Sequence, residues 1–207
     1  MTEDNKWLKY AKKLQSIAQA GLTYSQDEYH RERFEQIKEI SLDILKNYTE
    51  IDRKKIRNIF AEGEGYPTPK VDVRAAVFKK GKILLVKEKQ DKRWSLPGGW
   101  AEVDLSLKEN IIKETEEEAG VKVRPLRIIA IQDRRKHNEP PSAYGIYKIF
   151  VECEYIEGSF EKNVETLNAA FFERENLPEL SEPRNSVEQI DMCFTVKDKE
   201  VHEPYFD

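Results

Sequence analysis

The stretch LPGGWAEVDLSLKENIIKETEEEAGV, residues 96–121, places a glycine pair just before a segment rich in glutamate. Ser106 and Glu109 have the spacing of a capping box, which predicts that a helix begins at residue 107. The helix can run through Ala119 and end at Gly120, because glycine readily adopts the left-handed conformation of a helix terminus. Its predicted buried stripe consists of Leu107, Ile111, Ile112, Thr115 and Ala119.

Three glutamates lie on one side of this predicted helix. Glu114, Glu117 and Glu118 occupy positions i, i+3 and i+4, where like charges repel by roughly 0.2–0.5 kcal/mol per pair. Carboxylate oxygens are the ligands that Mg²⁺ and Mn²⁺ prefer, and a divalent cation would remove the repulsion. The alternative is a solvated acidic face, to which we assign Glu116 because it points elsewhere.

The glycine pair favours a functional site over a solvated face. Gly98 and Gly99 sit on the loop before the helix, and backbone without a Cβ can bring a carbonyl to a metal or an amide to a phosphate. A glycine loop beside an acidic helix face suits metal-assisted hydrolysis of a phosphorylated substrate.

The same stretch resembles the Nudix box, G-x5-E-x7-R-E-U-x-E-E-x-G-U, in which U is apolar. Read from Gly99, the match includes Glu114, Glu117, Glu118 and Gly120. The resemblance implies an α/β fold, the Nudix α/β/α sandwich with a mixed sheet. It also implies hydrolysis of the pyrophosphate in a nucleoside diphosphate linked to a group X, with Mg²⁺ or Mn²⁺ as cofactor. Carried over, the three glutamates bind metal and activate water, and the Gly98 carbonyl is a further ligand.

Two charged positions of the box are replaced in this chain. Leu105 stands at the first glutamate and Lys113 at the arginine, two residues that can pair in the family and brace the loop. With both replaced, neither charge is left without its partner. Lys113 can instead meet Glu109, and Glu102 or Asp104 can supply a loop carboxylate. The departures leave the number of metal ligands open, and they favour the alternative of a Nudix-fold binding module with weakened catalysis.

Residues 1–62 are expected to form an all-helical N-terminal domain. Apolar residues recur at helical spacing from Trp7 to Ala18, and Gly21 predicts the end of that helix. Residues 25–28 form a capping box for a second helix, and residues 49–52 can cap a third. Three helices in this length make a thin core, so the segment should rest on the other domain or on a second copy of the chain. We expect a homodimer.

The segment WLKYAKKLQSIAQAGLTYSQDEYHRERFEQIKEI, residues 7–40, is similar to the helical extension of a bacterial Nudix group that includes CDP-choline pyrophosphatases. This resemblance implies that CDP-choline is cut to CMP and phosphocholine. ADP-ribose and RNA ends are the rival substrates.

The character of the chain changes after the glycine- and proline-containing stretch 62–70, which predicts a linker at residues 63–70 and a second domain at 71–207. Runs at 71–78 and 82–89 predict a hairpin, and the runs 122–133, 144–156 and 169–172 predict further strands. Residues 186–196 fit a closing helix. A mixed sheet with helices on its faces follows.

A basic loop, residues 132–148, supplies further candidate site residues. Its cations can hold phosphates beside the metal, and Tyr144 can stack on a base; the alternative is an ordinary solvated hairpin loop. Gly99 and Trp100 are expected to line the pocket, and Glu165 or Glu173 is the candidate general base outside the box. The basic candidates are Arg134, Arg135, Lys136, His137 and Lys148.

The bulk composition excludes several classes of function. A formal net charge of −4 gives no overall attraction to nucleic acid or to an anionic membrane. Cys153 and Cys193 are too few for a disulfide framework and lack metal-ligand spacing, which predicts two buried reduced thiols. With no signal-peptide pattern and no apolar stretch of membrane-spanning length, we expect a soluble cytoplasmic protein.

Overall fold

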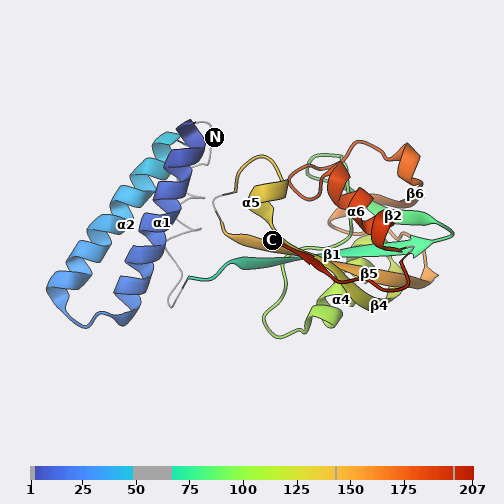
Figure 1. Cartoon of the computed structure of the whole chain (residues 1–207), viewed down its shortest axis with the longest axis horizontal. Helices are drawn as coiled ribbons and strands as arrows, with labels where there is room; N and C mark the ends of the chain where they lie inside the picture. Colours follow the sequence, from blue (N-terminus) through green and yellow to red (C-terminus); the bar gives the residue numbers. More distant parts are fainter. Residues whose placement is uncertain (1–2, 49–66, 143, 198) are drawn as a thin grey trace. The chain divides into compact units, whose positions relative to one another are not determined.

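The structure is a computed structural model that describes residues 3–48, 67–142, 144–197 and 199–207. The chain forms two compact units, Met1–Pro69 and Lys70–Asp207, which divide inside the expected linker (Figure 1). The first unit contains helix α1 (Glu3–Tyr24) and helix α2 (Glu28–Tyr48), joined by a short loop. The predicted third helix and residues 63–66 of the linker lie outside the described residues.

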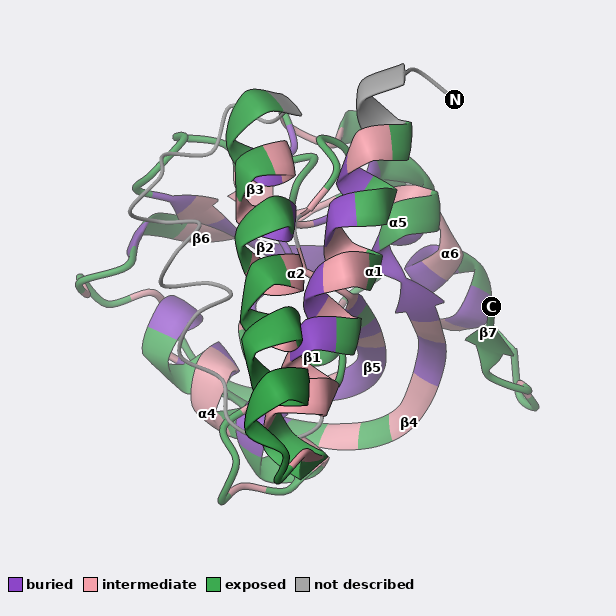
Figure 2. Ribbon diagram, turned by 90° about the vertical axis from the view of Figure 1, so that its left-hand side faces the viewer, coloured by how far each residue is buried: buried purple, intermediate pink, exposed green. Residues whose placement is uncertain are grey.

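Two details of the helical unit differ from the sequence prediction. Helix α1 continues through Gly21, where an added Cβ would lie 2.4 Å from the ring of Phe34 on α2; the glycine serves close packing and does not end the helix. Helix α2 is capped by Asp27, whose Oδ1 accepts the amide of His30 at 2.9 Å, and not by Ser25. Between the helices, the buried Ser41 hydroxyl donates to the Ala11 carbonyl at 2.8 Å. The buried positions on α1 follow one helical face (Figure 2).

The second unit is built on one mixed seven-stranded sheet. Its main path runs β3-β2-β1-β5-β4-β7, and β6 also pairs with β2. Strands β1 and β5 are parallel, whereas β1 with β2 and β4 with β5 are antiparallel. The strands are β1 (Lys70–Lys79), β2 (Lys82–Glu88), β3 (Trp94–Ser95), β4 (Val121–Asp133), β5 (Ile146–Gly158), β6 (Thr166–Phe172) and β7 (Tyr205–Phe206).

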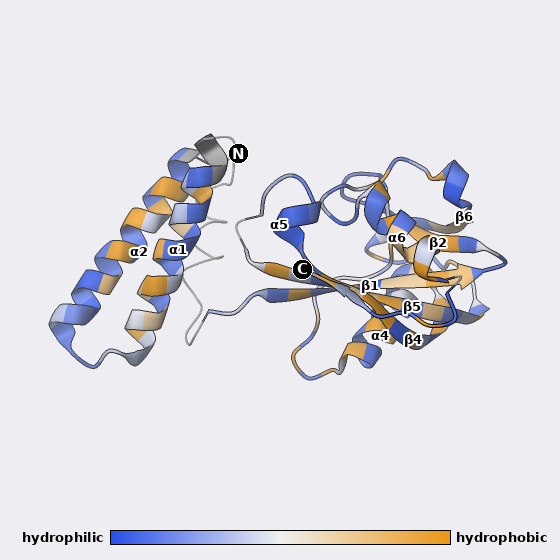
Figure 3. Ribbon diagram, viewed as in Figure 1, coloured by the Kyte–Doolittle hydropathy of each residue, from blue (hydrophilic) through white to orange (hydrophobic). Residues whose placement is uncertain are grey.

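Helices cover both faces of this sheet. Alternate residues of a strand point to opposite faces, so Ile83 and Leu85 of β2 pack with helix α6 (Val187–Lys197), while Leu84 and Val86 pack with helix α4 (Leu107–Ala119). The apolar residues concentrate in the strands (Figure 3). A short helix α5 (Arg134–His137) and a 3₁₀ turn (Arg174–Asn176) complete the unit. The expected α/β/α arrangement with a mixed sheet is confirmed.

Helix α4 follows the local sequence rules closely. Ser106 accepts the amide of Glu109 while the Glu109 carboxylate accepts the amide of Ser106, and Gly120 ends the helix at φ +65°. Of the predicted buried stripe, Ile111, Thr115 and Ala119 are buried and Leu107 is partly buried, whereas Ile112 is exposed. Asn110 and Glu118 are also buried. Both cysteines are buried free thiols. Among the described residues, no helix is long and apolar enough to cross a membrane.

Candidate active site

The glycine pair and helix α4 meet at one point. The amide of Gly98 donates to Oε2 of Glu118 at 2.9 Å, and Glu118 is only 5% exposed. Gly98 adopts φ +138°, and a Cβ there would lie 2.0 Å from the carbonyl oxygen of Val73, so only glycine fits. A Cβ on Gly99 would lie 3.1 Å from a carboxylate oxygen of Glu114. Glycine at position 98 therefore lets the loop lie against β1, and glycine at position 99 leaves room for the Glu114 carboxylate.

These groups open onto a cavity of about 820 Å³, here called the glycine-loop cavity. It brings together residues from β1, β2, α4, α5, β5 and five connecting loops. The lining residues are Asp72, Arg74, Glu88, Lys89, Gln90, Gly98, Gly99, Trp100, Glu114, Glu118, Arg134, Ser142, Tyr144, Ile146, Glu165, Pro183 and Arg184.

Burial changes the protonation of the two cavity carboxylates. It raises the pKa of Glu118 to about 8, although the nearby Arg74 charge and the Gly98 amide oppose the shift. Burial also raises the pKa of Glu114, again against Arg74 and against Lys113. Two carboxylates held together with raised pKa values are suited to a divalent cation, because the cation would favour their charged forms.

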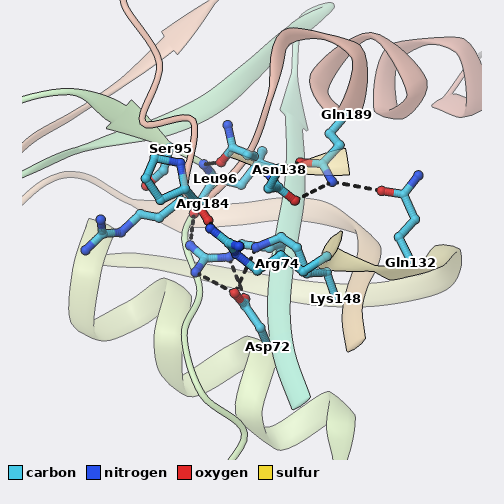
Figure 4. Close-up of polar contacts among 12 residues, drawn as sticks. Asp72, Arg74, Ser95, Leu96, Gln132, Asn138, Lys148, Arg184 and Gln189 are labelled. Atoms are coloured by element: carbon cyan, nitrogen blue, oxygen red, sulfur yellow. Dashed lines mark hydrogen bonds and ion pairs between the residues drawn. The ribbon is translucent and has the colours of Figure 1, made fainter. Parts of the chain in front are cut away.

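A buried ion network lies along β1 at the cavity floor (Figure 4). Arg74 donates from Nε to Asp72 Oδ1 at 2.7 Å and from Nη1 to the Leu96 carbonyl at 3.1 Å. The Nζ of Lys148 donates to Asp72 Oδ2 at 2.8 Å. Burial alone would raise the pKa of Asp72, but Arg74 and Lys148 outweigh it and bring the pKa below its ordinary value. Asp72 thus holds the Arg74 guanidinium near the glutamates.

Lys148 does not have the predicted phosphate-binding position. Its side chain is completely buried, and burial lowers its pKa to about 8. It belongs to the β1 network and not to the cavity lining. The sequence could not show this, because the parallel register of β1 and β5 that pairs Asp72 with Lys148 joins strands far apart in the chain.

Of the other four basic candidates in this loop, one lines the cavity and three pair with acidic residues outside it. Arg134 lines the cavity, 6% exposed, with Nη1 donating to the Pro140 carbonyl at 2.9 Å. Arg135 pairs with Asp133, Lys136 lies 3.9 Å from Asp207, and His137 contacts Asp207. Only Arg134 among these four lines the cavity.

Of the three glutamates predicted to share the site, Glu117 lies apart. Its half-exposed carboxylate accepts from Lys113 at 2.7 Å, and it does not line the glycine-loop cavity. Within the described part of the chain, no three His, Cys, Asp or Glu side chains converge closely enough to hold a metal ion. Glu165 lines the cavity, as predicted for a base candidate, whereas Glu173 pairs with Lys82 at 3.1 Å.

The loop between the glycines and α4 is held differently from the prediction. Lys113 pairs with Glu102 at 3.0 Å and not with Glu109, so Glu102 braces the loop and does not offer its carboxylate to the cavity. The buried Asn110 accepts the amide of Glu102 at 2.8 Å and donates to the carbonyls of Leu105 and Ser106, both at 3.1 Å. This chain thus replaces the bracing pair of the Nudix box with Glu102, Lys113 and Asn110.

Trp100 and Tyr144 both line the cavity, with ring centroids 6.5 Å apart in an edge-to-face arrangement. Four buried or half-buried charges of this site were not predicted from the sequence: Asp72, Arg74, Glu88 and Arg184. Glu88 accepts from Ser95 at 2.6 Å and from Arg184 Nε at 2.8 Å. The sequence did contain a signal for Arg74, because Asp72 and Arg74 are charged residues that alternate with Val71, Val73 and Ala75 in a predicted strand.

Comparisons with known proteins agree with this geometry. Residues 5–60 match the family described as a UDP-X-like, N-terminal oligomerisation domain, and residues 68–191 match the NUDIX domain. YjhB of Bacillus subtilis (strain 168), provisionally named an ADP-ribose pyrophosphatase, is 47% identical over 91% of each chain. A crystal structure titled ADP-ribose pyrophosphatase from Streptococcus suis 89-1591 is 44% identical, covers 68% of this chain and 100% of its own, and has a TM-score of 0.63. A crystal structure titled UDP-X diphosphatase is 32% identical over 100% of both chains, with a TM-score of 0.64. The chain therefore belongs to the Nudix family of hydrolases, with the N-terminal helical extension of its UDP-X-like members.

Proposed function

We propose that this protein hydrolyses the pyrophosphate bond of a nucleoside diphosphate linked to a group X, with Mg²⁺ or Mn²⁺. The observation that carries the proposal is the pair Glu114 and Glu118, both with raised pKa values, held against Gly98 and Gly99 in one cavity. The cavity has the volume of a small-molecule site.

The residues present fit a divalent cation. Glu118 is buried against the Gly98 amide, and Gly99 lacks the Cβ that would crowd the Glu114 carboxylate. Glu114 and Glu118 would hold the ion together with the Gly98 carbonyl, and Glu117 could join them after leaving Lys113. When bound, such an ion supplies positive charge that stabilises the pyrophosphate and its leaving group.

The chain's own cations and carboxylates supply the remaining chemistry. Arg134 lines the cavity with its guanidinium already oriented by the carbonyls of Pro140 and Pro183, which suits binding of a phosphate. Glu165 lines the same cavity close enough to Glu114 for their charges to interact. In the proposed reaction, water attacks one phosphorus, a carboxylate, Glu165 being our candidate, takes the water proton, and the bridging P–O bond breaks.

Two substrates are the leading candidates. The similarity of the N-terminal segment to the extension of CDP-choline pyrophosphatases favours CDP-choline. ADP-ribose is the second candidate, because the YjhB relative and the Streptococcus suis structure carry that activity in their names.

The test is a turnover assay with Mg²⁺ or Mn²⁺ and a panel of CDP-choline, ADP-ribose, UDP-sugars and short RNA. Glu118→Gln and Glu114→Gln should each lower kcat/KM by about 10²-fold or more. Each substitution keeps the size of the side chain but removes the negative charge that would bind the metal ion. Glu116→Gln is the matched control on the same helix, because Glu116 is exposed and lies outside the cavity lining. Absence of turnover across the panel, or equal activity of Glu118→Gln and Glu116→Gln, would contradict the proposal.

A further inference from the structure

An aromatic corner at the edge of the glycine-loop cavity already holds a cation. The ammonium of Lys70 lies 4.2 Å from the ring centroid of Tyr144 and 5.5 Å from that of Trp100. Both distances are within the range of a cation–π interaction, which requires about 6 Å or less. Trp100 and Tyr144 line the cavity, whereas Lys70 is exposed beside it. We call Lys70, Trp100 and Tyr144 the aromatic corner.

The sheet register fixes this corner. Lys70 opens β1, and its amide donates to the carbonyl of Gly145 at 2.9 Å, directly after Tyr144. Trp100 forms an isolated bridge with Asp72, two residues further along β1. Because side chains two apart on a strand share a face, Lys70 continues the row of Asp72 and Arg74 outward along the cavity. The backbone therefore brings all three residues of the corner together.

We infer that Lys70 is a specificity-determining residue that selects against substrates whose group X is a cation. The inference rests on the proposed function, since it concerns the X group of the same substrate; of the two candidates named there, it favours ADP-ribose over CDP-choline. The rings would suit a quaternary ammonium such as choline, but the Lys70 ammonium already lies over both of them. A cationic X must displace this ammonium or bind close to it, and two like charges a few ångströms apart repel each other. A neutral X, such as a sugar or glycerol, meets no such repulsion.

The test uses two substrates that share a base and differ in the charge of X: CDP-choline and CDP-glycerol. Each is measured as a substrate, and also as a competitive inhibitor of whichever panel compound is turned over. Lys70→Met removes the charge and keeps an unbranched apolar side chain. It should raise the kcat/KM ratio, or the ratio of inhibitory affinities, in favour of CDP-choline by about tenfold, while Lys70→Arg keeps the ratio of the unaltered protein.

Lys79→Met is the matched control. Lys79 ends the same strand, and its ammonium also lies over an aromatic ring, 3.7 Å from the centroid of Tyr155, outside the cavity lining. This variant should leave the ratio unchanged. High salt should narrow the difference between Lys70→Met and the unaltered protein, because the repulsion is screened.

The results distinguish a failure of the role assigned to Lys70 from a failure of the proposed function. An unchanged ratio in Lys70→Met, with turnover retained, overturns the role of Lys70 and leaves the proposed function intact. An equal change for both CDP compounds also overturns it, because Lys70 would then act on the part that they share. If neither compound binds and nothing in the panel is hydrolysed, the proposed function fails as well.

Discussion

At the scale of single residues, the site depends on charges that burial makes costly. Glu118 is almost fully buried, and the Gly98 amide and the Arg74 charge offset only part of the cost of ionising it. Arg74 is itself held by Asp72, whose second oxygen is bonded to Lys148. The carboxylate that should hold a cation is thus supported by a chain of alternating charges, and it is destabilised when that cation is absent.

The metal-free protein should accordingly lose stability as the pH rises from about 4.5 to about 8. In this window the folded protein keeps a proton on Glu118 that the unfolded chain has already released, so the free energy of unfolding falls with rising pH. Each unit of pKa difference corresponds to about 1.4 kcal/mol. Urea unfolding at several pH values with a chelator present measures the slope.

Glu118→Gln should flatten that slope, because glutamine does not titrate, and Glu116→Gln should preserve it. Glu114, whose pKa is also raised, adds to the slope in the same direction. A Glu118→Gln protein whose unfolding free energy depends on pH as steeply as the unaltered chain would contradict this account of the site.

At the scale of elements, the loop between Gly99 and α4 has two kinds of support. The Glu102–Lys113 pair is exposed, and exposed ion pairs contribute little to stability. Asn110 is 1% exposed and links the loop through three hydrogen bonds to the backbone of Glu102, Leu105 and Ser106. Unpaired buried polar groups are costly, so the amide should be the stronger support.

Asn110→Ala should therefore destabilise the protein by about 1–3 kcal/mol, because it leaves loop amide and carbonyl groups without their partner. It should also lower kcat/KM, since the loop carries Gly98 and Gly99 to the carboxylates. Glu102→Gln should leave the unfolding free energy nearly unchanged. Urea unfolding and kinetics on both variants rank the two supports, and a larger effect from Glu102→Gln would reverse the ranking.

The elements also show how far the sequence alone could predict this molecule. Helix α4 was predicted with its capping box and its left-handed end because those signals are local, within a few residues of one another. The predictions that Gly21 ends α1 and that Ser25 caps α2 were wrong. Gly21 is required by close packing against Phe34 on the neighbouring helix, and Asp27 caps α2 in place of Ser25. The ion network of Asp72, Arg74 and Lys148 could not be predicted, because it depends on the pairing of β1 with β5, two strands far apart in the sequence. Lys148 was therefore predicted to bind phosphate, and Arg74 was not predicted as a site residue.

At the scale of the whole molecule, the chain joins a Nudix unit to a helical hairpin with apolar side chains left exposed. Tyr10, Ile17 and Tyr24 of α1 are 44%, 45% and 68% exposed, and they recur every seven residues, so they lie along one side of the helix. On α2, Ile40 is 54% exposed. Residues 5–60 match a family described as an oligomerisation domain, and a hairpin of this size buries little apolar surface alone.

We therefore predict a homodimer formed through the α1–α2 unit. Ile17→Asp puts a charge in the middle of the exposed apolar row, and burying that charge in an interface would be costly, so the variant should shift toward monomer. Val201→Asp is the control, because Val201 is an exposed apolar residue, 83% accessible, on the other unit. Light scattering and sedimentation measure the mass of both variants across a range of concentrations. A monomeric unaltered chain would refute the dimer, whereas a dimer unaffected by Ile17→Asp would place the interface on another surface. Since each Nudix unit carries its own glycine-loop cavity, a monomeric Ile17→Asp protein should keep turnover. Loss of turnover in that monomer would contradict this and would assign part of the site to the partner copy.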